Sequence, residues 1–155
     1  MEQTVYTGAE SQLVVFKLGT EEYGVRILQV QEIKRMTDIT RVPHTPEYIK
    51  GVINLRGSVL PVIDLKKRLN LPDGVFGEET RIIIVNLDDL AVGLIVDGVS
   101  EVTAISNEQI DSAQAIAGAA VGSGFISGVG KLDNRLLILL NLETIIGAGT
   151  DSKTA

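Results

Sequence analysis

The chain has 155 residues, of which 45% are apolar and 4% aromatic, and it contains no cysteine. A chain of this length forms one ordinary domain or two very small ones, and this composition supports a packed core built mainly from Val, Ile and Leu. The formal net charge of −6 disfavours nucleic acid or an anionic membrane as a partner, and the lack of cysteine excludes disulfides and thiolate metal sites. The acidic N-terminus is unlike a secretory signal and no apolar run is long enough for a membrane span, so a cytoplasmic protein is expected.

The first half of the chain is predicted to consist of strands and turns, because its apolar residues are mainly β-branched. Residues 12–27 form the pattern of a strand, a polar turn and a second strand. Residues 28–36 alternate apolar and polar side chains, with Val30 and Ile33 as candidate inward residues. Two X-Pro bonds then predict a loop within residues 37–51.

A hairpin follows at residues 49–65, and Asp64 is placed to cap a short helix over residues 64–70. The second half has a comparable order of elements. Strands are expected at 80–87, 90–98 and 99–105, a capped helical turn at 106–110, a loop at 111–124, a hairpin at 125–142 and a helix at 142–147 that ends at Gly147.

The two halves also resemble each other residue by residue. Residues 23–33 align with 92–102, and residues 48–69 align with 125–146. Residues at matching positions are called repeat partners below: Gly24 and Gly93, Val30 and Val99, Glu32 and Glu101, Tyr48 and Phe125, Gly51 and Gly128, Leu55 and Leu132. The duplication predicts two similar small β-barrels. Because a unit of about 60 to 70 residues buries too little surface alone, the barrels are expected to pack on each other, and a terminal strand of one half could complete the other barrel.

The turn of the first hairpin carries one charged group, Arg56. The corresponding turn of the second hairpin contains Asp133 and Asn134, which is ordinary turn chemistry. Gly57 can supply the backbone freedom that the first turn needs, so the fold gives no reason for an arginine there. Arg56 is therefore either a solvated residue at a loop tip or a contact residue.

The sequence contains no recognisable catalytic or metal-binding arrangement. The only histidine, His44, lies in a predicted loop without a G-x-S-x-G motif elsewhere in the chain. Asp88 and Asp89 lack the spacing of a calcium loop, and the glycines around Gly124 match no phosphate-binding pattern. A binding module is favoured over a small-molecule enzyme that uses a groove between the barrels.

Four segments carry a resemblance to a known family: YGVRILQVQEI, PEYIKGVINLRGSVLPVIDL, GLIVDGVSEV and DNRLLILLNLETII. In this combination they resemble the CheW family, the coupling proteins of bacterial chemotaxis. The resemblance implies an all-β fold of two SH3-like five-stranded β-barrels packed together, with a few short helices. The barrels would be residues 11–78 and 79–147, with flexible tails at 1–10 and 148–155, and a crossing of the termini between the barrels is left open.

The resemblance also implies a function. Members of this family are non-enzymatic adaptors without a cofactor. They link the cytoplasmic tips of methyl-accepting chemotaxis receptors to the regulatory domain of the histidine kinase CheA, so that receptors control kinase autophosphorylation. Such a protein is cytoplasmic, is recruited to receptor arrays through its partners, and neither inserts into the membrane nor binds nucleic acid. The alternative is a CheW-like adaptor for a non-chemotactic sensory kinase array.

Matching motif positions imply a receptor-binding groove. Its residues would be Val30, Glu32, Arg56, Gly57, Val99 and Val102. For Val102 a place in the core is an equal alternative, and Gly57 is equally explained by the turn. Glu32 and Arg56 are expected to form an ion pair that fixes the hairpin tip. No residue is assigned to kinase binding.

Overall fold

The computed structural model describes residues 10–112 and 124–152, with side chains described up to residue 147. The strands are β1 (Glu10–Leu18), β2 (Glu21–Arg26), β3 (Val30–Arg35), β4 (Ile49–Leu55), β5 (Ser58–Asp64), β6 (Arg81–Leu87), β7 (Leu90–Val96), β8 (Gly98–Ser106), β9 (Ile110–Ser112), β10 (Ile126–Leu132) and β11 (Arg135–Leu140). The helical elements are the 3-10 turns η2 (Ile27–Gln29) and η3 (Asn107–Gln109) and the helices α1 (Leu65–Arg68) and α3 (Leu142–Ser152). The expected all-β fold with a few short helices is confirmed.

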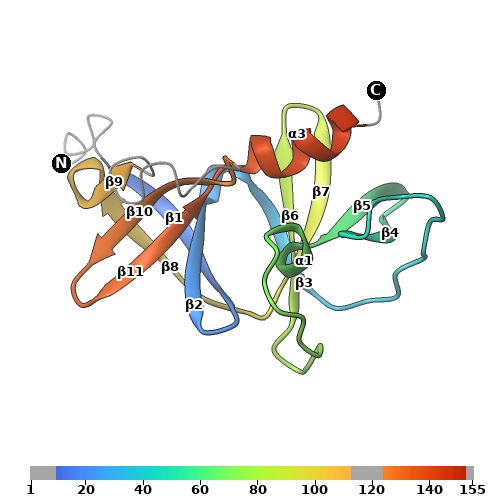
Figure 1. The fold of residues 1–155 in the computed structure, drawn as a ribbon, viewed down its shortest axis with the longest axis horizontal. Helices are drawn as coiled ribbons and strands as arrows, with labels where there is room; N and C mark the ends of the chain where they lie inside the picture. The colour runs from blue at the N-terminus through green and yellow to red at the C-terminus, as the bar shows by residue number, and fades with distance from the viewer. Residues whose placement is uncertain (1–9, 113–123, 153–155) are drawn as a thin grey trace.

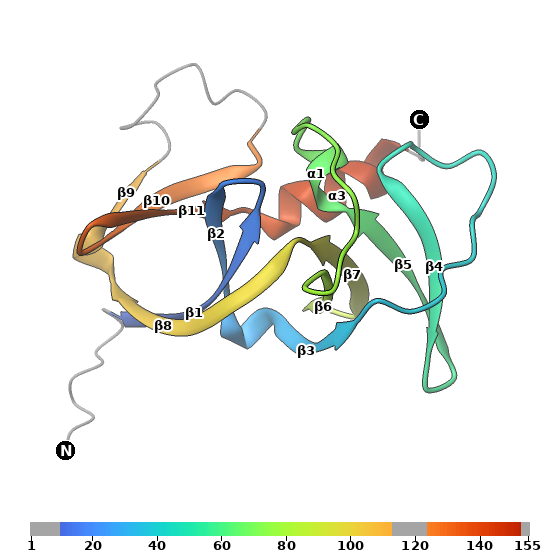
Figure 2. The ribbon, with the colours of Figure 1, turned by 90° about the horizontal axis from the view of Figure 1, so that it is seen from below.

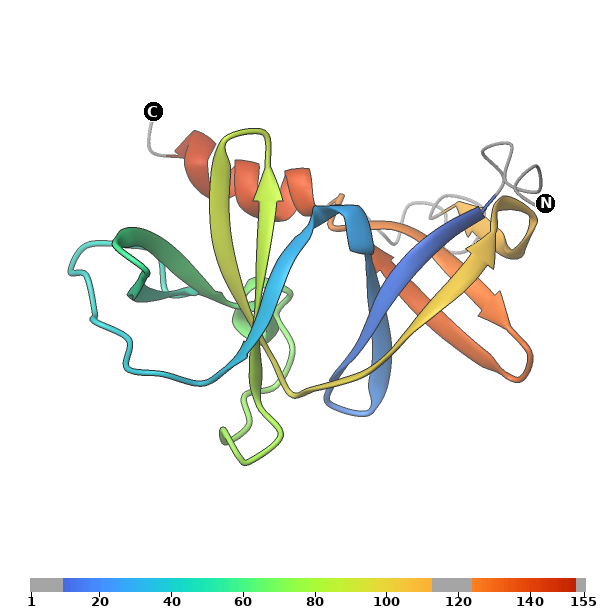
Figure 3. The same ribbon diagram turned by 180° about the vertical axis from the view of Figure 1, so that it is seen from behind.

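The strands form two sheets that lie next to each other (Figure 1). One sheet has the order β8-β1-β2-β11-β10-β9 and the other the order β3-β6-β7-β5-β4. Most strand pairs in both sheets are antiparallel. Each sheet also has one parallel pair, which joins strands from different halves of the sequence: β11 with β2 in the sheet that contains β8, and β5 with β7 in the sheet that contains β3. Figure 3 shows the chain passing from β2 through η2 into β3, and from β7 directly into β8, as it crosses between the sheets.

The sheets do not follow the expected division at residue 78. The hairpin β1–β2 of the first half belongs to the sheet that is otherwise built from the second half, and the hairpin β6–β7 of the second half belongs to the sheet built from the first half. Each repeat therefore contributes a whole hairpin to the other barrel. Below, the sheet with β3 is called the first barrel and the sheet with β8 the second barrel.

In both barrels the chain that follows one edge strand turns back to pair with a strand at the other edge. After β3 the chain turns back so that Thr40 pairs with Val52 of β4, through hydrogen bonds of 2.9 and 2.8 Å between their main-chain atoms. In the second barrel the chain after β8 continues through η3 into β9, which pairs with β10. The second sheet therefore has six strands where five were expected, because a closure that is a single bridge in one barrel is a three-residue strand in the other.

Two repeat-partner glycines allow these closures. A Cβ atom on Gly51 would lie 2.2 Å from the carbonyl oxygen of Thr40, and one on Gly128 would lie 2.7 Å from the carbonyl oxygen of Asp111. Both neighbours are backbone atoms of the closing segment, which cannot move aside as a flexible side chain could. Glycine is therefore needed at both positions because the main chains approach so closely.

Gly51→Ala is expected to destabilise the protein by about 2 kcal/mol or more, because the methyl group pushes the closing segment away from β4. Gly77→Ala is the matched control, since a Cβ there meets no atom within 4 Å. Urea unfolding of both variants measures the difference. Equal midpoints for the two variants would contradict the assigned role of Gly51.

The apolar core has three parts. The interior of the first barrel contains Ile53, Leu55, Leu60, Val62, Ile82, Ile84 and Ile95. The interior of the second barrel contains Leu13, Val15, Ile105, Leu137 and Leu139. The largest cluster joins side chains of both sheets, α1 and α3, among them Phe16, Tyr23, Ile83, Leu94 and Ile145. The barrels therefore share a common core, as the small size of each unit required.

The helices agree with the sequence in their starts but not in every end. The side chain of Asp64 accepts a hydrogen bond from the main-chain N–H of Lys67 and caps α1, as predicted. Ser106 and Gln109 form a capping box around η3. The last helix does not end at Gly147 but continues to Ser152, because Gly147 is not among the residues with the positive φ of a helix-ending glycine. The loop was predicted at 111–124, but residues 111 and 112 belong to strand β9, and residues 113–123 lie outside the described residues.

Figure 2 shows α3 against the first barrel, so that the chain returns to that barrel after completing β11. None of the described helices combines the length and apolar composition that crossing a bilayer requires.

Candidate protein-interaction site

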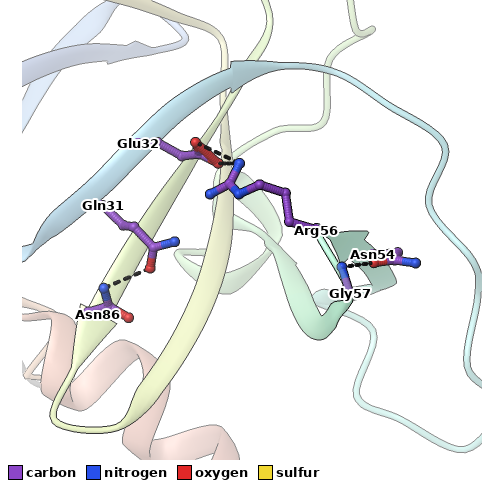
Figure 4. A network of polar contacts seen from close by, with 6 residues as sticks. All are labelled: Gln31, Glu32, Asn54, Arg56, Gly57 and Asn86. Atoms are coloured by element: carbon purple, nitrogen blue, oxygen red, sulfur yellow. Dashed lines mark hydrogen bonds and ion pairs between the residues drawn. The ribbon is translucent and has the colours of Figure 1, made fainter.

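The hairpin β4–β5 ends in an arginine that reaches back to β3. The Nη1 atom of Arg56 lies 3.3 Å from Oε1 and 3.1 Å from Oε2 of Glu32, so the predicted ion pair is present (Figure 4). Strands β3 and β4 are the two edges of the first sheet, and the ion pair spans the seam between them. The side chains are 67% and 28% exposed, so the pair contributes only about 0–1 kcal/mol to stability. Its main effect is to hold the guanidinium over β3.

The backbone of this turn is unusual for arginine. Arg56 has a φ of 51° and Gly57 a φ of 92°, so both residues occupy the left-handed region. The N–H of Gly57 donates a hydrogen bond of 2.9 Å to Oδ1 of Asn54, which closes the turn. A residue with a Cβ pays about 1–2 kcal/mol for this conformation. The sequence predicted that Gly57 supplies the backbone freedom of this turn. In the structure Arg56 also has a positive φ, at a position that favours Gly or Asn.

The second barrel carries a corresponding ion pair. Arg135, the first residue of β11, bonds to Glu101 of β8, which is the repeat partner of Glu32. Its Nε atom also lies 3.3 Å from Oε1 of Glu22 on β2. The repeat alignment did not identify Arg135, because the arginine stands two positions further along its hairpin than Arg56 does. The match of Glu32 with Glu101 was the available signal, since a glutamate repeated within an apolar strand calls for a partner in both halves.

The predicted valines lie at different depths. Val30 and Val99 are partly buried against the shared core of the two barrels. Val102 is 50% exposed, which excludes the alternative that it packs in the core. Ile33 is also exposed, contrary to the prediction that it faces inward, because residues three apart on a strand point to opposite faces. The structure thus brings Glu32, Arg56 and Gly57 together at the hairpin tip, places Val30 and Val99 against the shared core, and leaves Val102 exposed on β8.

Exposed apolar side chains flank both ion pairs. On the first barrel, Ile33 follows Glu32 on β3 and Val59 lies on β5 next to the turn. On the second barrel, their repeat partners Val102 and Leu136 are exposed in the same way. Isolated exposed apolar residues are common on protein surfaces. Here, however, the same two repeat positions are apolar and exposed on both barrels, close in the sequence to the residues of each ion pair. Such surfaces, with arginine among apolar residues, are suited to protein contacts.

A hollow at the junction of the barrels has other walls. It is lined by Leu18, Gly19, Thr20, Glu21, Lys66, Leu71, Pro72 and Asp73, none of which belongs to the predicted groove. Asp97 lies at the β7–β8 crossing, where its Oδ2 atom accepts from the N–H of Gly19 at 2.7 Å and is 2.9 Å from Nζ of Lys66. Gly19 and Lys66, which line this hollow, are therefore tied to the crossing by Asp97.

The described residues offer no constellation for catalysis. His44 is exposed in the loop before β4, and no cluster of three or more potential metal ligands occurs in 10–112 or 124–152. Burial and then the neighbouring Glu21 raise the pKa of the Tyr23 phenol, which keeps this hydroxyl neutral and unsuitable as a base. The chemistry at the hairpin tips is that of reversible polar and apolar contact.

Comparison with known proteins agrees with this architecture. The family model for the CheW-like domain matches residues 12–149. The chemotaxis protein CheW of Bacillus subtilis is 41% identical over 135 residues, covering 86% of this chain and 85% of that protein. The CheW protein of Klebsiella aerogenes is 39% identical over 137 residues, covering 88% of this chain and 82% of that protein. The crystal structure of the scaffolding protein TtCheW from Thermoanaerobacter tengcongensis superposes with a TM-score of 0.81 at 38% identity, covering 87% of this chain and 91% of that one. With its duplicated barrels and a family match over nearly its whole length, the chain belongs to the CheW-like family.

Proposed function

We propose that this protein is a non-enzymatic adaptor that couples chemoreceptor tips to the regulatory domain of the histidine kinase CheA. The observation that carries the proposal is the first hairpin tip. There an exposed arginine in a costly backbone conformation is held over an edge strand, and the exposed Val59 lies two residues beyond Gly57 on the same hairpin. A residue that strains its turn without adding much stability is best explained by a contact outside the chain.

The receptor contact would use the hairpin tip together with the seam between the barrels. Arg56 supplies planar, permanently charged donors, and Glu32 holds them in place. Val30 and Val99 reach the seam from the two barrels, Val102 adds exposed apolar area on β8, and Gly57 leaves room at the tip. This division of roles follows interfaces in which a few anchor residues, arginine among them, provide most of the affinity and the neighbouring contacts exclude water.

Control of the kinase requires more than binding. A receptor signal changes kinase activity through the adaptor only if the adaptor contacts the two receptor states with different free energies. The shared core makes both barrels one mechanical unit, so a shift at one barrel is felt at the other. The protein would act in the cytoplasm, recruited to receptor arrays by these contacts.

The direct test is a ternary assay of kinase autophosphorylation with receptor cytoplasmic fragments and CheA, with and without this protein. The protein is expected to bind both partners and to raise kinase activity at least about tenfold in the presence of receptor. Binding to neither partner would refute the proposal. Binding to a different sensory kinase, found by testing its regulatory domain in the same assay, would favour the alternative of an adaptor for a non-chemotactic array.

A further inference from the structure

One arginine is held between repeat-partner aromatic rings. The Cζ atom of Arg68, the last residue of α1, lies 4.2 Å from the ring centre of Tyr48 and 4.6 Å from that of Phe125. Tyr48 directly precedes β4 of the first barrel, and Phe125 directly precedes β10 of the second. The guanidinium therefore occupies the place where the two repeats meet.

The same guanidinium is also bonded to α3. Its Nε atom donates to the carbonyl oxygen of Ile145 at 3.0 Å, and its Nη2 atom donates to the carbonyl oxygen of Thr144 at 3.4 Å. These edge contacts and the two ring-face contacts use different parts of the planar group, so all four are made together. The repeat partner of Arg68 is Ile145, so a single cation serves both halves.

The contacts of Arg68 join parts of the chain that are attached to different barrels. Helix α1 continues from β5 of the first barrel, whereas Phe125 and α3 flank the hairpin β10–β11 of the second. The start of α1 has a link of its own to the crossing, since Lys66 pairs with Asp97. The shared apolar core couples the two barrels, but burial by itself has little directional preference. Arg68 adds contacts that have a direction.

We propose that Arg68 is the positioning residue that fixes the angle between the two barrels, and that it requires a planar guanidinium. Lysine would keep the charge but has no planar fork of donors, so it could not contact both rings and donate to the two carbonyl groups in the same way. The consequence for kinase control rests on the proposed function: a fixed angle would let a receptor contact at one barrel be transmitted to the other.

The free protein tests the structural claim without any partner. Since the chain has no cysteine, nitroxide labels can be placed at Ser58→Cys and Asn134→Cys, one on each hairpin tip, and their distance distribution measured by pulsed electron paramagnetic resonance. The parent protein is expected to give one narrow distribution. Arg68→Ala and Arg68→Lys are expected to broaden it about twofold, as for units no longer held at one angle. Lys67→Ala is the matched control, because Lys67 lies on the same helix, is bonded by its side chain to Asp73, and contacts neither ring.

Unchanged widths in Arg68→Ala would overturn the proposal, and an unchanged width in Arg68→Lys would overturn the need for a guanidinium. If Arg68→Ala does not fold, Tyr48→Leu and Phe125→Leu remove one ring at a time and should each broaden the distribution, whereas narrow distributions in both would overturn the proposal. In the ternary assay, Arg68→Ala should lower kinase activation about fivefold while changing the binding of each partner less than about twofold. If the parent protein fails to activate the kinase, the proposed function falls, but the distance measurements still decide the role of Arg68.

Discussion

Leu55→Asp is expected to unfold the protein. Leu55 is 7% exposed and packs in the interior of the first barrel with Ile53 and Leu60. The substitution removes a buried apolar side chain and places a carboxylate where the surrounding cluster offers no polar partner, at a cost of about 4 kcal/mol or more. Circular dichroism during urea unfolding measures the loss.

The control comes from the same hairpin. Val59 is 69% exposed, so Val59→Asp should change the free energy of unfolding by less than about 0.5 kcal/mol. Because the largest core cluster contains residues of both barrels, Leu55→Asp is expected to abolish the structure of the whole chain in one transition. A second barrel that stays folded, with its own separate transition, would show that the shared core does not couple them.

Arg56→Ala is expected to abolish coupling between receptor and kinase with little effect on folding. Alanine keeps the Cβ atom, so the variant retains the left-handed strain of the turn and removes only the guanidinium. The lost ion pair is exposed, so stability should change by less than about 1 kcal/mol. The affinity for a receptor fragment should fall about tenfold or more, as for an arginine anchor at an interface. Titration calorimetry with the fragment and thermal unfolding of the free variant give the two quantities.

A double-mutant cycle with Glu32→Gln separates direct contact from orientation. If Arg56 touches the receptor, Glu32→Gln should weaken binding much less than Arg56→Ala does. If the ion pair itself shapes the groove, both single variants and the double variant should lose the same affinity. Receptor affinity that is unchanged in all three variants would make Arg56 a solvated loop residue.

The local elements of this fold were readable from the residues. β-branched runs, the Asp64 cap, the capped turn at Ser106 and the two hairpins each depend on residues within a few positions, and all of them are present. The ion pair of Glu32 with Arg56 was also expected, because the family motif brings its two members together. The end of the last helix was missed, since the Gly147 signal is only a tendency that packing and continued hydrogen bonding can override.

The strands, the turns and the existence of a repeat can be predicted from the residues, because they arise from side-chain alternation and backbone preferences that act locally. Which strands join which sheet depends on the tertiary arrangement, since a hairpin exposes the same main-chain donors and acceptors to either barrel. The partners of Arg135 and Arg68 could not be predicted from the sequence, because they lie far away along the chain. Glu101 lies 34 positions before Arg135, and the carbonyl group of Ile145 lies 77 positions after Arg68. Such contacts depend on how the two repeats exchange their hairpins, and no local pattern encodes that exchange.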